Sequence, residues 1–473
     1  MAYAEKLVTS WRACWQVPGK KAPEKLSGFA SKKEALKHAN EQEVEARRRG
    51  RVRSDASQLL LRDWAEEWYS ALDLEPATLR GYRSTLTNHI IRQWGEWRLR
   101  DIAGADHAIA AWKRELLQDY AEGTVHGIMG KLVTLLGDDV DQGLIYRNPA
   151  VTRRGRGKVA PKRKQRREDR YKHVTDPLGA FRIAERAAYL SGRDDEFVLL
   201  MAKYWLGLRW GETVGLTSES VSTSFTLARQ LYEHPGQRFY WKEPKGGSER
   251  PLDVPPFLIE LLDHQACHGE RHEAEGEWCP CGDDLPAEYH HAPGIHLFSG
   301  IDGELHQRAN PFRASYFHPA AQGLYYAGTR QEFPVYLTDP QDPWSVAPTG
   351  KGVRPPKEPA GTWEAICAGM KPHGLRHSHR MLLEDMGTPK VLMDERLGHM
   401  DASISARYSH VTPAMRRRLL EGLHERWEEC VGQRRKMDLP SPVPLVKSIL
   451  EGDSRSTPDT KSRRGNRSRG MMA

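Results

Sequence analysis

The chain has no long apolar run, and its 473 residues have a mean hydropathy of −0.68. A transmembrane helix needs about 20 consecutive apolar residues, so we expect no membrane span. The opening residues MAYAEKLVTSWRACW contain no apolar signal segment either. Cysteine is scarce, with six residues in the whole chain, which argues against a disulfide scaffold. These absences predict a cytoplasmic protein whose thiols are mostly reduced.

The length and the charge balance indicate several domains and an anionic partner. A chain of 473 residues exceeds a usual single domain, so two to four domains are expected. The net charge is +8 and the isoelectric point is about 9.0. A basic balance favours nucleic acid as the partner, although many soluble proteins share it.

Residues 371–411 hold the most informative stretch, KPHGLRHSHRMLLEDMGTPKVLMDERLGHMDASISARYSHV. The spacing of its apolar residues predicts three short helices. Gly387 and Gly398 stand where the first two helices would end, a place that favours glycine. Asp401 can cap a third helix, which would run from residue 402 to about residue 410.

Two histidines, an arginine and a tyrosine would converge if these helices pack on one another: His373, Arg376, His399 and Tyr408. This set suits phosphoryl transfer on a nucleic acid. A tyrosine can act as the nucleophile, an arginine can bind two phosphate oxygens, and a histidine can move a proton near neutral pH. Because arginines can supply the positive charge, no metal is required.

The motifs H-G-L-R-H and L-G-H, with a tyrosine nine positions after the second, resemble those of the tyrosine recombinases, the phage-type integrases. The resemblance predicts two further motifs upstream. The first is an arginine turn, present as GLRWGE with Arg209 and Glu212. The second is a lysine in a β-hairpin, present as EPKGGSERPLDVPP with Lys245 and Arg250. Four motifs in the expected order make the resemblance specific.

The resemblance implies a site-specific recombinase that cuts and rejoins DNA through a 3′-phosphotyrosyl link. The catalytic residues that it implies are Arg209, Lys245, His373, Arg376, His399 and the nucleophile Tyr408, with Glu212 and His377 in support. Lys245 would protonate the leaving oxygen, and His373 would accept the proton of Tyr408. Taken singly, each residue could instead be an ordinary surface charge, a capping histidine or a packing aromatic.

The implied fold is multidomain, with a small α+β N-terminal domain, an all-α core-binding bundle, and a mixed, mainly-α α+β catalytic domain of the tyrosine recombinase type. The expected boundaries are an arm-type DNA-binding-like domain at 1–50, a core-binding (SAM-like) domain at 58–150, a basic linker at 151–172, the catalytic domain at 173–430 and a disordered basic tail at 431–473. An appendage for protein contacts is the alternative for residues 1–50.

Basic side chains in the bundle and in the linker are candidates for phosphate contacts on DNA. They are Arg80 and Arg83, which lie off the apolar stripe of a predicted helix, and Arg153, Arg154, Lys162, Arg163 and Lys164. The linker could also be a passive tether. The aromatic stripe of the bundle is expected to form its core.

Two insertions, near 264–296 and 320–365, interrupt the expected catalytic domain. The first could hold a structural zinc ion, because thiolate and imidazole are zinc ligands. The candidate ligands are Cys267, His272, Cys279 and Cys281. The spacing C-P-C is tighter than the usual C-x-x-C, so a surface loop with free thiols is the alternative. The second insertion is rich in proline and glycine and is expected to be a long surface loop.

The resemblance also implies partners: double-stranded DNA attachment sites, a homotetramer on synapsed DNA, and a directionality factor or a host DNA-bending protein. It implies no cofactor for the chemistry and a cytoplasmic, nucleoid-associated location. The helix after Tyr408 could pack on a neighbouring protomer or on its own. Two other functions stay open, a type IB topoisomerase-like strand transferase and a catalytically silent DNA-binding protein with the same fold.

Overall fold

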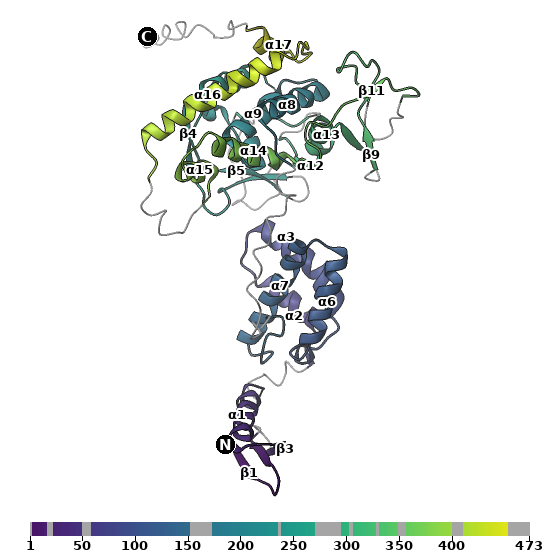
Figure 1. Ribbon diagram of the computed structural model, residues 1–473, viewed down its shortest axis with the longest axis vertical. Coiled ribbons are helices and arrows are strands. Elements are labelled where there is room, and N and C mark those ends of the chain that lie inside the picture. Colours follow the sequence, from purple (N-terminus) through teal and green to yellow (C-terminus); the bar gives the residue numbers. More distant parts are fainter. Residues whose placement is uncertain are drawn as a thin grey trace, which may run out of the picture. The chain divides into compact units, whose positions relative to one another are not determined.

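The computed structural model describes residues 2–16, 22–49, 58–151, 173–234, 238–269, 295–301, 306–327, 331–348, 356–399 and 410–452. The chain forms two compact units, residues 1–163 and 164–473 (Figure 1). Within the described residues the structure is mainly helical with small sheets, in agreement with the expected multidomain, mainly-α fold. No helix in these ranges combines the length and the apolar character that a membrane span needs.

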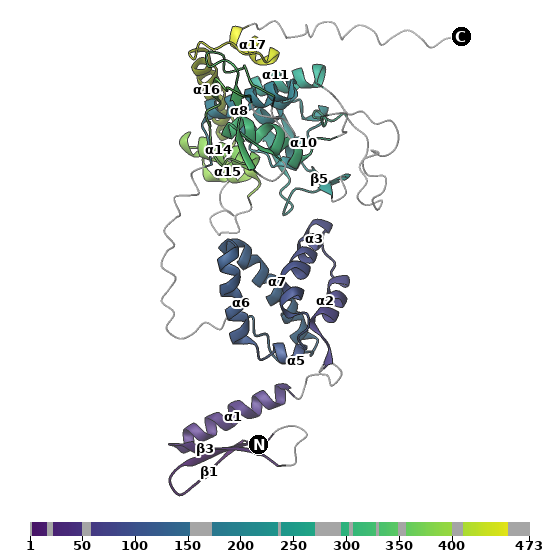
Figure 2. The same ribbon diagram turned by 90° about the vertical axis from the view of Figure 1, so that its right-hand side faces the viewer.

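The first unit begins with a three-stranded antiparallel sheet of order β1-β2-β3, which one helix covers (Figure 2). Its elements are β1 (Tyr3–Lys6), β2 (Trp11–Trp15), β3 (Glu24–Phe29) and α1 (Lys32–Arg49). Ala13 and Trp15 of β2 pack on Ala35 and Ala39 of α1. Small alanines let the helix lie close to the sheet. The apolar–polar alternation around Trp11 predicts the strand, whereas β1 has no such signal in the sequence.

A helical bundle follows, built around tryptophans. It contains α2 (Leu61–Ser70), α3 (Pro76–Thr85), a π-helical turn (Leu86–Ile90), α4 (Ile91–Trp94), α5 (Leu99–Ile102), α6 (Asp106–Asp119) and α7 (Glu122–Asp141). Trp64, Trp68, Trp94 and Trp112 are each at most 5% exposed and belong to one apolar cluster. The aromatic stripe is therefore the core of the bundle, as its helical spacing predicts.

Asp139 is the exception within this apolar core. Its side chain is fully buried, and neither carboxyl oxygen has a hydrogen-bond partner among the described residues. Burial disfavours the charged form and raises the pKa of Asp139 from 3.8 to about 7, against a smaller opposing effect of Trp64. The folded bundle therefore favours the protonated acid near neutral pH.

This buried acid makes the stability of the bundle depend on pH. The pKa of Asp139 is higher in the folded state than in the unfolded state. The stability of the bundle is therefore undiminished by this acid below about pH 4, and it decreases as pH rises through about 7, where folded Asp139 must lose its proton. We predict that Asp139→Asn is more stable than the parent by roughly 2–4 kcal/mol at pH 8, and little different at pH 3.5. Urea unfolding followed by tryptophan fluorescence measures this difference.

Asp141→Asn is the matched control, since Asp141 lies two residues away on the same helix and is exposed. It should leave the pH dependence of unfolding unchanged. An Asp139→Asn protein that is no more stable than the parent at pH 8 would contradict the assignment.

The second unit is organised around one helix, α9 (Asp195–Leu206), every residue of which is buried. It packs against α8 (Pro177–Ser191), α10 (Trp210–Val214), α11 (Pro256–His268) and α14 (Pro372–Asp385) (Figures 1 and 2). Two antiparallel strand pairs lie beside these helices. Strand β4 (Ser224–Leu227) pairs with β7 (Arg250–Asp253), and β5 (Gln230–His234) pairs with β6 (Arg238–Lys242). A wholly buried helix explains the near-continuous apolar run of α9.

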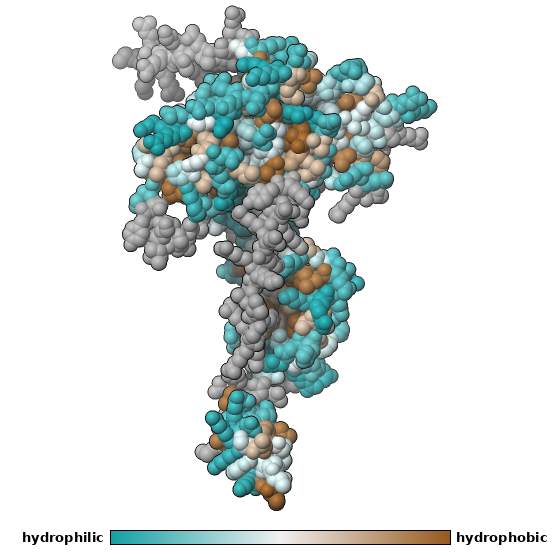
Figure 3. Space-filling model, in the orientation of Figure 1, coloured by the Kyte–Doolittle hydropathy of each residue, from teal (hydrophilic) through white to brown (hydrophobic). Residues whose placement is uncertain are grey.

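The long C-terminal helix α16 (Pro413–Arg435) packs on its own unit. Trp427 stacks on Phe257 of α11, with ring centroids 4.6 Å apart. Arg434 forms a buried two-bond ion pair with Glu185 of α8, at 2.9 and 2.7 Å. Figure 3 shows hydrophilic residues along the outer side of this helix. Within the single chain, therefore, the helix docks in cis.

The expectation of disorder beyond residue 430 is wrong for residues 431–452. Helix α16 continues to Arg435, and α17 (Pro444–Glu451) follows it. Val446 of α17 is fully buried in the apolar core of the unit. The polar and basic residues that suggest disorder begin only after this helix.

The expectation that residues 320–365 form a surface loop is also wrong for the described part. The segment follows α12 (Ala309–Phe312), a π-helical turn (Arg313–Phe317) and α13 (His318–Gln322). It forms two short antiparallel strand pairs, β8 (Leu324–Ala327) with β9 (Gln331–Pro334) and β10 (Tyr336–Leu337) with β11 (Gly361–Thr362). Trp344 and Trp363 pack with Tyr189 of α8. The Nε1 of Trp344 donates to the carbonyl of Pro440, at 2.9 Å. The insertion is thus bound to both α8 and the C-terminal segment.

Candidate active site

A tight turn after α9 places Arg209 at the start of α10. The turn begins at Gly207, whose φ of +68° suits glycine. A Cβ atom at this position would lie 2.5 Å from Cδ2 of His379 and 2.9 Å from Cδ2 of Leu397. Glycine therefore allows the turn to approach α14 and α15 (Lys390–Leu397) closely, which brings Arg209 to the point where these helices meet.

Glu212 lies beneath this point and contacts three arginines. Arg209 donates to it twice, from the backbone N–H to Oε2 and from Nη1 to Oε1, both at 2.8 Å. Arg250 of β7 donates to both oxygens, at 3.2 and 2.9 Å. Nη1 of Arg376 on α14 lies 3.7 Å from Oε2. One fully buried carboxylate thus joins three segments of the chain.

The charge balance of this cluster is positive. Burial alone would raise the pKa of Glu212, but hydrogen bonds and charge from Arg250, and then from Arg209, lower it to about 2. The carboxylate is therefore ionised at all physiological pH values. This one carboxylate contacts three guanidinium groups, so the cluster of described side chains keeps a net positive charge that favours binding of a further anion.

Arg376 is 4% exposed and is held in place from two sides. Nη1 donates to the carbonyl of Gly207 at 2.6 Å, and Nη2 donates to the carbonyl of Leu397. Nη2 also lies 3.3 Å from Nε2 of His399. Burial, and then repulsion from Arg209, lower the pKa of Arg376 to about 10, so it stays charged at neutral pH.

His399 follows the left-handed residue Gly398, which ends α15 with a φ of +61°. A Cβ atom on Gly398 would lie 2.9 Å from both Nη1 of Arg250 and Oγ of Ser248. Nη2 of Arg209 donates to the Gly398 carbonyl at 3.4 Å. The His399 side chain is 40% exposed, and burial of the rest, with the charge of Arg376, lowers its pKa. His399 can therefore face an incoming ligand.

His373 and His377 are exposed, one turn apart on α14, with ring centroids 4.8 Å apart. Although the ring of His373 reaches solvent, partial burial and then the charge of Lys203 lower its pKa to about 4. Burial and the charge of Arg376 also lower the pKa of His377. Near neutral pH both rings are uncharged, and an uncharged imidazole can accept a proton.

Comparison with known proteins gives one clear sequence relative and several structural ones. No protein-family model matches the chain. The predicted prophage phiRv2 integrase of Mycobacterium tuberculosis, in two strains, is 23% identical over 356 residues, which cover 74% of this chain and 73% of the relative. The resemblance to the tyrosine recombinases is confirmed.

Two solved structures of integrases align with this integrase-like chain. The Tn1549 transposon integrase in complex with a circular intermediate DNA is 14% identical, with a TM-score of 0.47, and the alignment covers 76% of this chain and 98% of that one. A lambda integrase tetramer bound to a Holliday junction is 16% identical, with a TM-score of 0.42, and the alignment covers 87% of this chain and 98% of that one.

Lys245 lies on the exposed turn between β6 and β7. The same turn reaches the arginine cluster through Ser248, whose Oγ accepts from Nη1 of Arg209 at 3.4 Å. The neighbouring Lys242 is placed differently, with Nζ 4.1 Å from the ring centroid of Tyr232. Lys245 is therefore close in sequence to Ser248, which contacts the cluster, but within the described residues Lys245 itself does not contact the cluster.

Several predicted residues lie outside the described ranges: the nucleophile candidate Tyr408, the linker residues Arg153, Arg154, Lys162, Arg163 and Lys164, and His272, Cys279 and Cys281. Cys267 is an exposed cysteine near the end of α11. Among the described residues no group of side chains could hold a metal ion, so the zinc hypothesis has no support there.

The two DNA-binding candidates of the bundle lie on α3. Arg83 forms an ion pair with Glu66 at 2.6 Å, and its guanidinium lies 3.9 Å from the ring centroid of Tyr69. It would have to leave these partners to bind phosphate. Arg80, one turn before it, lies on the same helix.

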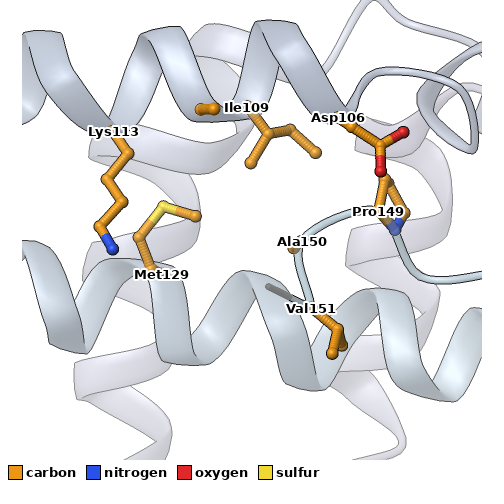
Figure 4. Close-up of a pocket in the computed structure, with 8 residues that line it drawn as sticks. Asp106, Ile109, Lys113, Met129, Pro149, Ala150 and Val151 are labelled. Carbon is orange, nitrogen blue, oxygen red and sulfur yellow. The ribbon is translucent and has the colours of Figure 1, made fainter. Parts of the chain in front are cut away.

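The bundle also contains a pocket of about 400 Å³ between α6 and α7 (Figure 4). Ile109 and Met129 give it apolar walls, and Lys113 lies beside them. Asp106, at one end of the pocket, is paired with Arg147. None of the predicted catalytic residues lines this pocket, so it is separate from the arginine cluster.

Two buried cations of the site received no role from the motifs. Arg250 stands in the hairpin motif EPKGGSERPLDVPP, and only the structure assigns it to Glu212. Lys203 interrupts the apolar run of α9, and this lone cation in a buried helix is the signal that could have revealed it.

We predict that Glu212→Gln destabilises the second unit by about 3–5 kcal/mol at pH 7, because it leaves buried guanidinium groups without their carboxylate. The folded pKa of about 2 lies below the ordinary 4.5, so the stabilisation is present above pH 4.5 and is lost as pH falls towards 2. Urea unfolding of parent and variant at pH 7 and pH 3 measures the loss. The exposed Glu219→Gln is the control, and equal stability of both variants would contradict the prediction.

Proposed function

We propose that the chain is a site-specific DNA recombinase, which cuts and rejoins DNA through a 3′-phosphotyrosyl intermediate. The observation that carries the proposal is the convergence of Arg209, Arg376 and His399, from three separate segments, above the buried Glu212. The motif order along the chain and the sequence similarity to a prophage integrase support it.

The cluster has the properties that a phosphodiester ligand requires. Guanidinium groups bind phosphate oxygens through paired hydrogen bonds and keep their charge. Glu212 binds Arg209, and the carbonyls of Gly207 and Leu397 bind Arg376, so the positions of both guanidinium groups are fixed before DNA binds. A preorganised cation pair stabilises the charge that develops on a pentacoordinate phosphate.

Tyr408 is the proposed nucleophile. Both flanks of its segment are anchored near the cluster: His399 adjoins Arg376, and Arg416 binds Asp253 of β7 at 2.7 Å and also Glu395 of α15. The Oη–P bond forms as the P–O5′ bond breaks. His373 takes the tyrosine proton, and Lys245 gives a proton to the 5′ oxygen. Attack by a 5′-hydroxyl of a partner strand reverses the step and needs no metal or ATP.

The domain assignment belongs to the same proposal. Residues 1–50 would contact arm-type DNA sites, residues 58–150 and the linker at 151–172 would hold the core site, and residues 173–430 would carry the chemistry. Four protomers on two duplexes would integrate or excise a mobile element. The four-motif pattern, together with the sheet-and-helix unit before the bundle, favours this function over a type IB topoisomerase.

A nicked suicide substrate tests the proposal. The full chain is incubated in EDTA with nicked duplexes that carry candidate attachment sequences, and covalent adducts are separated under denaturing conditions. We predict a covalent protein–DNA adduct with the parent chain and none with Tyr408→Phe, because the phenylalanine keeps the ring but lacks the attacking oxygen.

Tyr326→Phe is the matched control, because its hydroxyl bonds Glu332 on the β8–β9 hairpin, away from the arginine cluster. It should form the adduct at the parent rate. Specific binding without any adduct from the parent chain would favour the catalytically silent DNA-binding protein instead.

A further inference from the structure

Lys203 is an unusual residue for its place in the fold. It lies in α9 between buried apolar residues, and its own side chain is fully buried. Burying an ammonium group is costly unless it is hydrogen-bonded and paired. A methionine of similar length would fill the same space without this cost, so packing alone does not explain a lysine here.

Two hydrogen bonds tie Lys203 to the turn that presents Arg209. Its backbone carbonyl accepts from the N–H of Leu208 at 3.2 Å, and its Nζ donates to the carbonyl of Leu208 at 2.7 Å. Both the N–H and the carbonyl of Leu208 are therefore hydrogen-bonded to Lys203. The next residue along the chain is Arg209, and the preceding one, Gly207, accepts the hydrogen bond of Arg376.

The charges around Lys203 belong to the same site. Burial lowers its pKa to about 7, Glu212 acts in the opposite direction, and Arg376 and Arg209 lower the pKa further. Lys203 is also the largest charged contributor to the lowered pKa of His373. A change at Lys203 would thus act on both arginines and on the proposed proton acceptor.

We propose that Lys203 is a positioning residue, which fixes the Gly207–Arg209 turn through Leu208 and so sets the guanidinium of Arg209 beside that of Arg376. This inference rests on the proposed function, since the arginine pair matters as a phosphate site. Lys203 itself does not touch the substrate. Because the turn begins at a left-handed glycine, the Nζ bond adds a second restraint to a flexible point.

The test separates the chemical step from binding and from folding. Lys203→Met is compared with the parent and with the exposed Lys447→Met on α17, by single-turnover adduct formation at saturating protein. We expect the cleavage rate constant of Lys203→Met to fall roughly 10- to 100-fold, the cost of a small misplacement of a reacting group. The Kd for the DNA should not rise, and any fall in the thermal midpoint should be small, since removal of a costly buried charge offsets the lost hydrogen bond to the Leu208 carbonyl.

An unchanged cleavage rate in Lys203→Met would overturn the proposal. A parallel loss of rate, DNA affinity and thermal midpoint would also overturn it, because that pattern describes a residue needed only for folding. If Lys203→Met does not fold, Lys203→Gln replaces it, since its amide is one atom too short to reach the Leu208 carbonyl.

A crystal structure of the same variant gives a readout that does not depend on activity. We expect the Leu208 carbonyl and the Arg209 guanidinium to shift relative to Arg376. An Arg209 that superposes on its parent position would overturn the positioning role. If the parent chain forms no adduct on DNA that it binds, the proposed function fails, whereas the crystallographic comparison still decides whether Lys203 positions Arg209.

Discussion

The second unit depends on one buried carboxylate. Glu212 receives hydrogen bonds from Arg209 and Arg250 and lies 3.7 Å from a nitrogen of Arg376, so it ties together α10, β7 and α14. These segments are far apart in the sequence. Removing one partner of such a buried network leaves unbalanced charge in the interior, so the same interaction that holds the fold also sets the geometry of the cationic surface above it.

Two left-handed glycines make this arrangement possible. Gly207 and Gly398 end α9 and α15, and a side chain on either would collide with the opposite element. The close approach lets backbone carbonyls of Gly207, Leu397 and Gly398 accept from the arginines. Backbone and carboxylate together hold the guanidinium groups, which leaves His399 partly exposed to meet a ligand.

The sequence predicts much of the site, because its signals are local. Gly387 and Gly398 mark the ends of α14 and α15, and the motifs bring Arg209, Arg376 and His399 to one place. The roles of Arg250 and Lys203 depend on which buried groups they meet, which periodicity does not encode. The sequence does not predict the strand pairs near Trp344 and Trp363, because their strands are short and their stability comes from aromatic packing on α8. The role of Tyr408 is a prediction from the motif alone.

A structure of the full chain bound to DNA that carries its recombination site would test the account most directly. The account predicts that one phosphate places its non-bridging oxygens within hydrogen-bond distance of Arg209, Arg376 and His399, while Glu212 keeps its bonds to Arg209 and Arg250. A backbone phosphate held elsewhere, with these three side chains turned away from the DNA, would contradict it.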